Sequence, residues 1–244
     1  MTEEPYRWLE AVANRRDYVR EQLAGAAPVF AASLNDGILM LGVGAGQSKV
    51  FEIHDRLGLA GLGHPADIEK IRQAAIDTAH IEAFARASED VSLRRLVSFG
   101  LGPLMKTQFE QIFSAPYLVE LLIAELGSAP EKDLVGQLHF DGSFQFRHGG
   151  VAVAGANTNS TSAACDWLSK QEVSNLDWKA MADRILQAWW LMRDERFFTD
   201  NLPDEPERRA GWQEAAKEKT IELGWLNRLG PKPARFQMLD AAEL

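Results

Sequence analysis

The sequence predicts an α+β fold: a four-layer αββα sandwich of two antiparallel sheets, with an extra helix at the N-terminus. Three observations support this prediction. Blocks of strands alternate with pairs of helices, which is not the strand–helix rhythm of a parallel sheet. Several strands are apolar on both faces, as expected when another layer covers each side of a sheet. Asp-Gly turns at Asp36-Gly37 and Asp141-Gly142 are typical of hairpins between antiparallel strands.

The first half of the chain predicts one helix, four strands and a helix pair. A helix is expected over residues 8–23, because apolar residues recur on one of its faces, and Gly25 ends it. Four strands are expected at residues 28–33, 38–41, 49–54 and 57–63. Pro65 opens a second helix that runs to about Arg86. A third helix, antiparallel to the second because the link is short, is expected over residues 93–113.

The second half repeats this order and then departs from it. Four strands are expected at residues 117–125, 134–140, 143–147 and 151–155, and two helices at 160–171 and 177–196. Residues 201–219 are charged and hold two prolines, so they are predicted to form a surface excursion. A last strand pair is expected at residues 220–227 and 234–239. No composition break demands a boundary, so residues 1–244 are expected to form one domain, with an N-terminal gate and helix over 1–25 and a sandwich core over 28–240.

Composition excludes several classes of protein. The formal net charge is -9, the sequence pI is near 5.1, and no block of basic residues appears, so a nucleic-acid surface is not expected. A single cysteine excludes an intramolecular disulfide framework. No apolar run approaches the roughly 20 residues of a membrane-spanning helix, and the first residues are polar. The sequence therefore predicts a soluble cytoplasmic protein.

Several stretches resemble proteasome subunits. Ser48-Lys-Val-Phe-Glu-Ile-His-Asp-Arg56, followed by Leu-Gly-Leu-Ala-Gly-Leu-Gly and a long helix, is similar to the segment in which these subunits carry a lysine before a strand. The turn at 140–144 and the strand at 151–155 are also similar to the family. A leading helix before the first strand separates α-type from β-type subunits. With the order of elements, these stretches resemble a bacterial, actinobacterial 20S proteasome α-type subunit over nearly the whole chain, residues 201–219 excepted.

The resemblance implies an N-terminal-nucleophile hydrolase fold without its catalytic set. Active members begin their first strand with Thr, Ser or Cys, whose free α-amine serves as the base. Pro28 matches that position here, and it has neither a hydroxyl nor a free amine. Val43 is matched to the acidic partner on the next strand, and Lys49 to the family's lysine. We therefore expect no catalytic residue in this subunit of a threonine-type protease complex.

Two routes to a nucleophile remain open from the sequence. Removal of Met1 would expose Thr2 as an N-terminal threonine, but Glu3-Glu4-Pro5 follows it rather than a strand. Cleavage before Ser33 would expose a serine but would discard most of the first strand. An active hydrolase with an unusual nucleophile is therefore kept as an alternative.

The resemblance also implies two non-catalytic sites. In α-type rings the lysine that Lys49 matches lies in a pocket between subunits and pairs with the C-terminal carboxylate of an activator, and an ammonium with three donors suits that group. The alternative is a surface lysine beside a strand edge. The segment near the axial pore, a candidate gate, comprises Thr2, Glu3, Glu4, Pro5, Tyr6 and Arg7.

The expected function is structural and regulatory, in protein degradation. The chain would form a homo-oligomeric ring, a heptamer by family analogy, that caps a ring of proteolytic β-type subunits, gates substrate entry and docks an ATPase unfoldase or other ring activator. Two alternatives are a self-contained active hydrolase ring and a stand-alone inactive ring.

Other motifs carry less specific signals. Residues 42–49 are rich in glycine but lack the Gly-Lys-Ser/Thr ending of a phosphate-binding loop, and a strand follows them. The five histidines are scattered, so neither a metal site nor a cofactor is expected. Cys165 is either a reactive thiol or, more commonly, a small buried residue. Trp189 and Trp190 cannot both lie centrally on one helix face, so one of them is a candidate contact with a neighbouring subunit.

Overall fold

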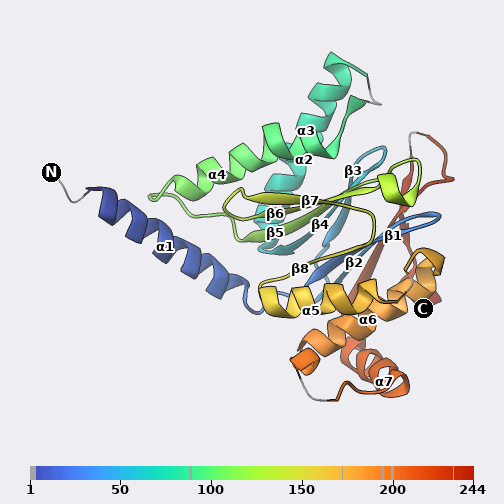
Figure 1. Ribbon diagram of the computed structural model, residues 1–244. Coiled ribbons are helices and arrows are strands. Elements are labelled where there is room, and N and C mark those ends of the chain that lie inside the picture. Colours follow the sequence, from blue (N-terminus) through green and yellow to red (C-terminus); the bar gives the residue numbers. More distant parts are fainter. Residues whose placement is uncertain (1–3, 88–89, 172, 194, 199–200, 233) are drawn as a thin grey trace.

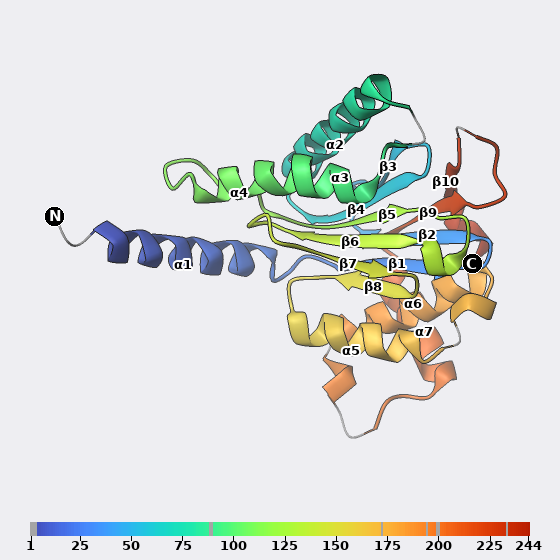
Figure 2. The same ribbon diagram turned by 45° about the horizontal axis from the view of Figure 1, so that its top comes forward.

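A computed structural model shows two five-stranded antiparallel sheets packed face to face between layers of helices (Figures 1 and 2). The structure describes residues 4–87, 90–171, 173–193, 195–198, 201–232 and 234–244. The predicted α+β sandwich with an N-terminal helix is confirmed.

The first sheet has the strand order β10-β9-β2-β1-β8. Its strands are β1 (Val29–Leu34), β2 (Gly37–Gly44), β8 (Val151–Ala154), β9 (Thr220–Asn227) and β10 (Phe236–Leu239). β1 and β2 form the predicted hairpin, in which Leu34 pairs with Gly37. All six residues of β1 are buried, as expected for a strand covered on both faces.

The second sheet has the strand order β3-β4-β5-β6-β7. Its strands are β3 (Val50–His54), β4 (Leu57–Gly63), β5 (Val119–Glu125), β6 (Leu134–His139) and β7 (Phe144–His148). Alternate side chains of each sheet enter the core between the sheets, where Met40 and Ala60 belong to one apolar cluster. The other side chains pack against the helix layers on either side.

Helices cover both outer faces (Figure 2). The face of the β3–β7 sheet is covered by α2 (Pro65–Ala85), α3 (Leu93–Arg95), a π-helical segment (Leu96–Leu101) and α4 (Gly102–Glu110). The face of the β10–β8 sheet is covered by α5 (Thr158–Ser169), α6 (Trp178–Arg193) and α7 (Glu205–Ala216). Short 3₁₀ turns lie at Pro130–Lys132, Val173–Asn175, Arg196–Phe198 and Ala241–Glu243. The single helix expected over residues 93–113 is thus divided by a π-helical turn.

The expected surface excursion at residues 201–219 is wrong in its central part. That stretch contains α7, which begins after the Asp204 cap, where the Asp204 carboxylate accepts from the backbone N–H of Glu207 at 2.9 Å. Gly211 lies against the ring of Trp190, so α7 packs on α6. Trp189 and Trp190 are therefore only 2% and 8% exposed, and neither is available to a neighbouring subunit as the sequence had suggested.

The N-terminal helix α1 (Glu4–Leu23) is longer than predicted and extends away from the sandwich (Figures 1 and 2). It begins four residues before Trp8, since Pro5 is accepted in the first turn of a helix. Val19 and Leu23 are buried in the core between the sheets. The Arg15 guanidinium donates to the carbonyl oxygens of Gln108 at 3.2 Å and Ser114 at 2.6 Å, at the C-terminal end of α4.

No helix within the described residues has both the length and the apolar character that crossing a membrane requires.

Candidate functional site

The start of β1 is the place where the sequence resemblance puts the reactive residue of an N-terminal-nucleophile enzyme. Pro28 is buried there, directly before Val29, and α1 and a short link precede it. A Cβ built on Gly155, at the end of β8, would lie 3.3 Å from the Pro28 Cβ, so the two backbones approach closely. The site around Pro28 therefore has a ring carbon in place of a hydroxyl.

Lys49 crosses the mouth of the sandwich beside Pro28. Its Nζ donates a hydrogen bond to the Ala27 carbonyl oxygen at 3.1 Å. The Lys49 stem lies over β2, where Cβ atoms built on Gly42 and Gly44 would meet it at 3.1 and 3.4 Å. Glycine at these two positions leaves the stem room to reach Ala27. An ammonium has three donors, and no second hydrogen-bond partner of this one is found among the described residues.

Glu222 fixes the backbone that presents Lys49. Its Oε2 accepts from the backbone N–H of Lys49 at 2.7 Å and of Val50 at 3.0 Å. Glu222 lies opposite Gly42 in the β2–β9 pairing, so its side chain points toward the same face of the sheet as the lysine stem. Burial lowers the pKa of Lys49 to about 8, although the Glu222 carboxylate partly offsets that effect. The Lys49 ammonium is therefore mostly charged at neutral pH and loses its proton readily above it.

Val43 does not face Lys49. Its side chain is buried in the outer cluster with Leu41 and Leu223, on the side of the sheet that the helices cover. Gly42 and Gly44 occupy the face toward Lys49, so the register expected from the sequence is shifted by one residue. Neither glycine provides a carboxylate, so the acidic partner that active relatives carry on this strand is absent at residues 42–44 in either register.

The other predicted residues are dispersed. Thr2 and Glu3 lie outside the described residues, whereas Glu4, Pro5, Tyr6 and Arg7 fall in the first turn of α1. Ser33 lies at the opposite end of β1 from Pro28, and its buried hydroxyl donates to Asp133 Oδ2 at 2.5 Å. The structure thus brings Lys49 together with Pro28, whereas Ser33, the candidate nucleophile that it describes, lies away from both.

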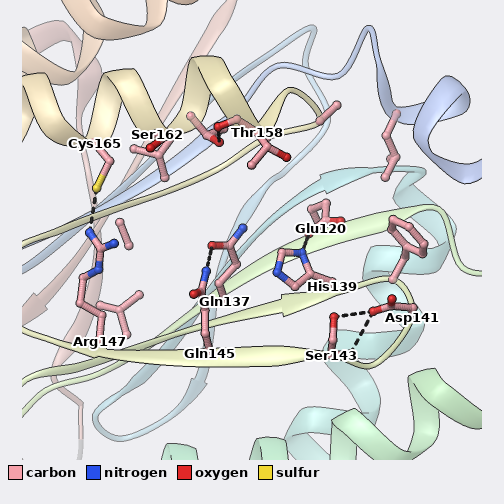
Figure 3. A pocket seen from close by; sticks show the side chains of 18 of the residues that line it. Glu120, Gln137, His139, Asp141, Ser143, Gln145, Arg147, Thr158, Ser162 and Cys165 are labelled. Carbon is pink, nitrogen blue, oxygen red and sulfur yellow. Dashed lines mark hydrogen bonds and ion pairs between the residues drawn. The ribbon is translucent and has the colours of Figure 1, made fainter. Parts of the chain in front are cut away.

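A cleft opens between β6–β7 and β8–α5 (Figure 3). This cleft has a volume of about 450 Å³. At one end His139 Nδ1 lies 2.7 Å from Glu120 Oε2, and at the other Arg147 Nη1 donates to the Cys165 sulfur at 2.7 Å. Burial raises the pKa of Glu120, and the hydrogen bond to Glu120 raises the pKa of His139. Cys165 is buried, in agreement with the commoner of its two expected roles.

The polar groups of the cleft are paired in a way that does not assemble a nucleophile with a base. The Ser143 hydroxyl donates to Asp141 Oδ1 at 2.5 Å rather than to His139. The Cys165 thiol donates to the Val151 carbonyl oxygen at 3.2 Å and has an arginine, not a histidine, beside it. Catalysis of the Ser–His or Cys–His kind needs the nucleophile within hydrogen-bond reach of an imidazole, and neither of these two pairs provides that arrangement.

Sequence reasoning missed Glu222, Ala27 and the Glu120–His139 pair. One signal for Glu222 was available, because an acidic residue interrupts an otherwise apolar strand at 220–227. The Ala27 contact uses a backbone carbonyl oxygen, so residue types gave no sign of it. Among the described residues, no group of three His, Cys, Asp or Glu side chains is arranged to hold a metal ion.

Comparison with known proteins identifies the family of this chain. A family model described as "Proteasome subunit" matches residues 40–195. "Proteasome subunit alpha" of Streptomyces coelicolor is 33% identical over 241 residues, which cover 96% of this chain and 85% of the relative. The protein of the same name from Streptomyces griseus is 33% identical over 237 residues, covering 96% and 80%. That of Kineococcus radiotolerans is 32% identical over 152 residues, covering 60% and 62%. The chain therefore belongs to the proteasome subunit family, as an α-type subunit of the bacterial kind.

Proposed function

We propose that this chain is a non-catalytic α-type subunit whose copies close into a ring. In this proposal the ring caps a proteolytic ring of β-type subunits, gates substrate entry and docks an ATPase activator. The observation that carries the proposal is the pairing of a buried Pro28 with Lys49, an ammonium that uses one of its three donors among the described residues. Among the described residues, the start of β1 presents the Lys49 ammonium beside a proline rather than beside a hydroxyl or thiol, which supports a binding role over a catalytic one.

Lys49 suits a terminal carboxylate as its ligand. Its ammonium makes one hydrogen bond to a neutral carbonyl oxygen and has two donors left for an incoming group. Glycines at 42 and 44 lie beneath the stem, so no side chain of β2 at these positions blocks the path of the ammonium to the mouth of the sandwich. A carboxylate at the tail of an activator fits both features, because it is small, anionic and able to accept more than one hydrogen bond.

The Lys49–Ala27 hydrogen bond supports a link between docking and the gate. Ala27 belongs to the short segment between α1 and β1, so a carboxylate that competes for Lys49 would act on the segment that carries α1. α1 extends from the sandwich, and the candidate gate residues that the structure describes, 4–7, lie at its far end (Figure 2). We therefore expect docking at Lys49 to change the position of α1.

The test is reconstitution with the β-type subunit and the ATPase of the source cell. The purified chain should form a ring and cleave no fluorogenic peptide, whereas the assembled particle should degrade an unfolded protein. Peptide hydrolysis by the isolated ring, abolished by Thr2→Ala or Ser33→Ala, would overturn the non-catalytic assignment and favour a self-contained hydrolase. A ring that binds neither partner would favour a stand-alone inactive ring.

Lys49→Ala tests the docking site within the same assay. We expect ATPase-stimulated degradation to fall by roughly tenfold or more, since a buried charge-assisted contact is lost, while ring mass and unstimulated peptide cleavage remain. Lys217→Ala is the matched control, because Lys217 is an exposed lysine that pairs with Glu214 near the end of α7. Stimulation in the wild type should also weaken above about pH 8, where the Lys49 ammonium loses its proton. Unchanged stimulation in Lys49→Ala would remove the docking assignment and leave the ring in place.

A further inference from the structure

The sheet β3-β4-β5-β6-β7 has two free edges, β3 and β7. Free edges invite pairing with another chain unless they are short, bulged or covered. β3 carries a register irregularity between Glu52 and His54. β7 has no such feature in the structure, and its five residues are exposed or half-exposed. β7 is therefore the edge that most needs a partner.

The two edges match each other on the helix side of the sheet. On β7, Phe144 and Phe146 point toward the helices, and the Arg94 guanidinium lies 5.0 Å from the Phe146 ring centre. On β3, Phe51 points the same way, and Arg72 lies 5.5 Å from its ring centre. Aromatic side chains thus stand at both edges of one face, which suits an apolar contact between them.

The two edges are opposite in charge on the inner side of the sheet. Arg147 of β7 points inward, where its Nη1 donates to Cys165 and to the Val151 carbonyl oxygen (Figure 3). Glu52 of β3 is exposed on the corresponding side. No carboxylate pairs with Arg147, and no cation pairs with Glu52, in the part of the chain that the structure describes. Repulsion from Asp55 adds to burial in raising the pKa of Glu52. Each edge therefore holds an uncompensated charge that the other edge would neutralise.

We propose that the β7 edge of one subunit packs along the β3 edge of the next, with Arg147 facing Glu52 and Phe146 facing Phe51. This inference rests on the proposed ring, and its occupant is a second copy of this chain. The two edges differ, so the contact is head to tail, the kind that closes into a ring when the rotation permits. Four successive antiparallel pairings separate β3 from β7, so the two strands run in the same direction in every copy.

The proposed register has a consequence for Lys49. In a parallel approach that pairs Arg147 with Glu52, residues before β7 lie beside residues before β3. The turn at 141–143 of the neighbouring copy then lies next to Lys49. The inferred contact would thus supply the second wall of the pocket between subunits that the resemblance implies for Lys49.

Charge reversal tests the contact on the purified full-length chain. Glu52→Arg should raise the subunit concentration at which half of the chains assemble by roughly tenfold or more, because Arg147 of the neighbour then faces a like charge. The double variant Glu52→Arg/Arg147→Glu should restore assembly, since every copy carries both edges. Glu214→Arg, on the exposed surface of α7, is the control and should assemble as the wild type does.

A crosslink tests the pairing without disturbing the charge. In Arg147→Lys, a water-soluble carbodiimide should join the introduced amine of one copy to Glu52 of another, and Glu52→Gln in the same background should abolish that linked peptide. If Glu52→Arg assembles into rings as the wild type does, the proposed edge contact is wrong. The same holds if rings of the Arg147→Lys variant yield no such link. Either result leaves the proposed ring function unaffected. A wild type that is monomeric at all concentrations overturns the ring itself. A linked species that stops at two subunits would indicate a closed dimer and would overturn the head-to-tail ring.

Discussion

Two basic residues stand at opposite ends of β1, and they are held in opposite ways. Arg228 lies at the C-terminal end of β1, where its five N–H groups donate to Asp133 through both carboxylate oxygens and to the carbonyl oxygens of Leu34, Asn35 and Gly127. Lys49 lies at the N-terminal end and donates once, to the Ala27 carbonyl oxygen. The side chains of Arg228 and Asp133 are 10% and 0% exposed.

The difference separates a structural cation from a binding cation. Every donor of Arg228 is used, so a ligand would have to displace a bond that the fold already makes. Lys49 has donors without a partner among the described residues, and the β2 positions beside its stem are glycines without side chains. A planar five-donor group suits a permanent clamp, whereas a mobile ammonium suits a ligand that arrives and leaves.

The largest expected loss of stability comes from removing Arg228, the permanent clamp on the buried Asp133 carboxylate. Arg228→Ala leaves the fully buried Asp133 carboxylate without its cation and should lower the free energy of unfolding by roughly 3–5 kcal/mol. Urea denaturation followed by tryptophan fluorescence measures this loss. Lys217→Ala, which removes an exposed pair with Glu214, is the control and should change the free energy by less than about 0.5 kcal/mol. If the two variants lose the same free energy of unfolding, a basic residue whose donors are all hydrogen-bonded is not thereby shown to be structural.

A smaller effect is expected from the serine that completes the clamp. Ser33→Ala removes the buried hydroxyl that donates to Asp133 at 2.5 Å, and it should cost roughly 1.5–2 kcal/mol, because the acceptor is ionised. Ser143 makes a hydrogen bond of the same length to Asp141 at an exposed turn. Ser143→Ala should therefore cost less than about 0.5 kcal/mol in the same denaturation experiment. The comparison isolates burial, because residue type and hydrogen-bond length are matched.

The sequence predicted the sandwich well because its signals are local. The hairpin at Asp36-Gly37 and the helix that Pro65 opens both depend on residues next to one another in the chain, and both are found. α7 was missed because charge and prolines dominate residues 201–219, while the partner that stabilises the helix, Trp190, lies on α6. Helical stability of this kind comes from packing rather than from propensity.

The site was predictable only in part, for a physical reason. Pro28 could be placed from the sequence because a proline stands where active relatives carry a nucleophile, and Lys49 because it matches the family's lysine. Ala27 contributes a backbone oxygen, and Glu222 lies 173 residues from Lys49, so both contacts depend on chain folding rather than on a local pattern. The shifted register at Val43 has the same origin, since one residue in a strand decides which face a side chain occupies.

The smallest stability effect is expected at Lys49, and its dependence on pH sharpens the contrast with Arg228. Lys49→Met should change the free energy of unfolding at pH 7 by less than about 1 kcal/mol, because burial of the ammonium offsets most of what its one hydrogen bond contributes. The folded state lowers the pKa of Lys49 from 10.5 to about 8. Between these values the unfolded chain binds more protons than the folded one, so the wild type should gain stability relative to Lys49→Met as the pH rises from about 8 to about 10.5. Urea denaturation of both proteins at pH 7, 8.5 and 10 measures that difference. If the difference in unfolding free energy between the wild type and Lys49→Met stays constant or shrinks across this range, the Lys49 ammonium is held as firmly as Arg228. Lys49 would then have no free donors for a carboxylate.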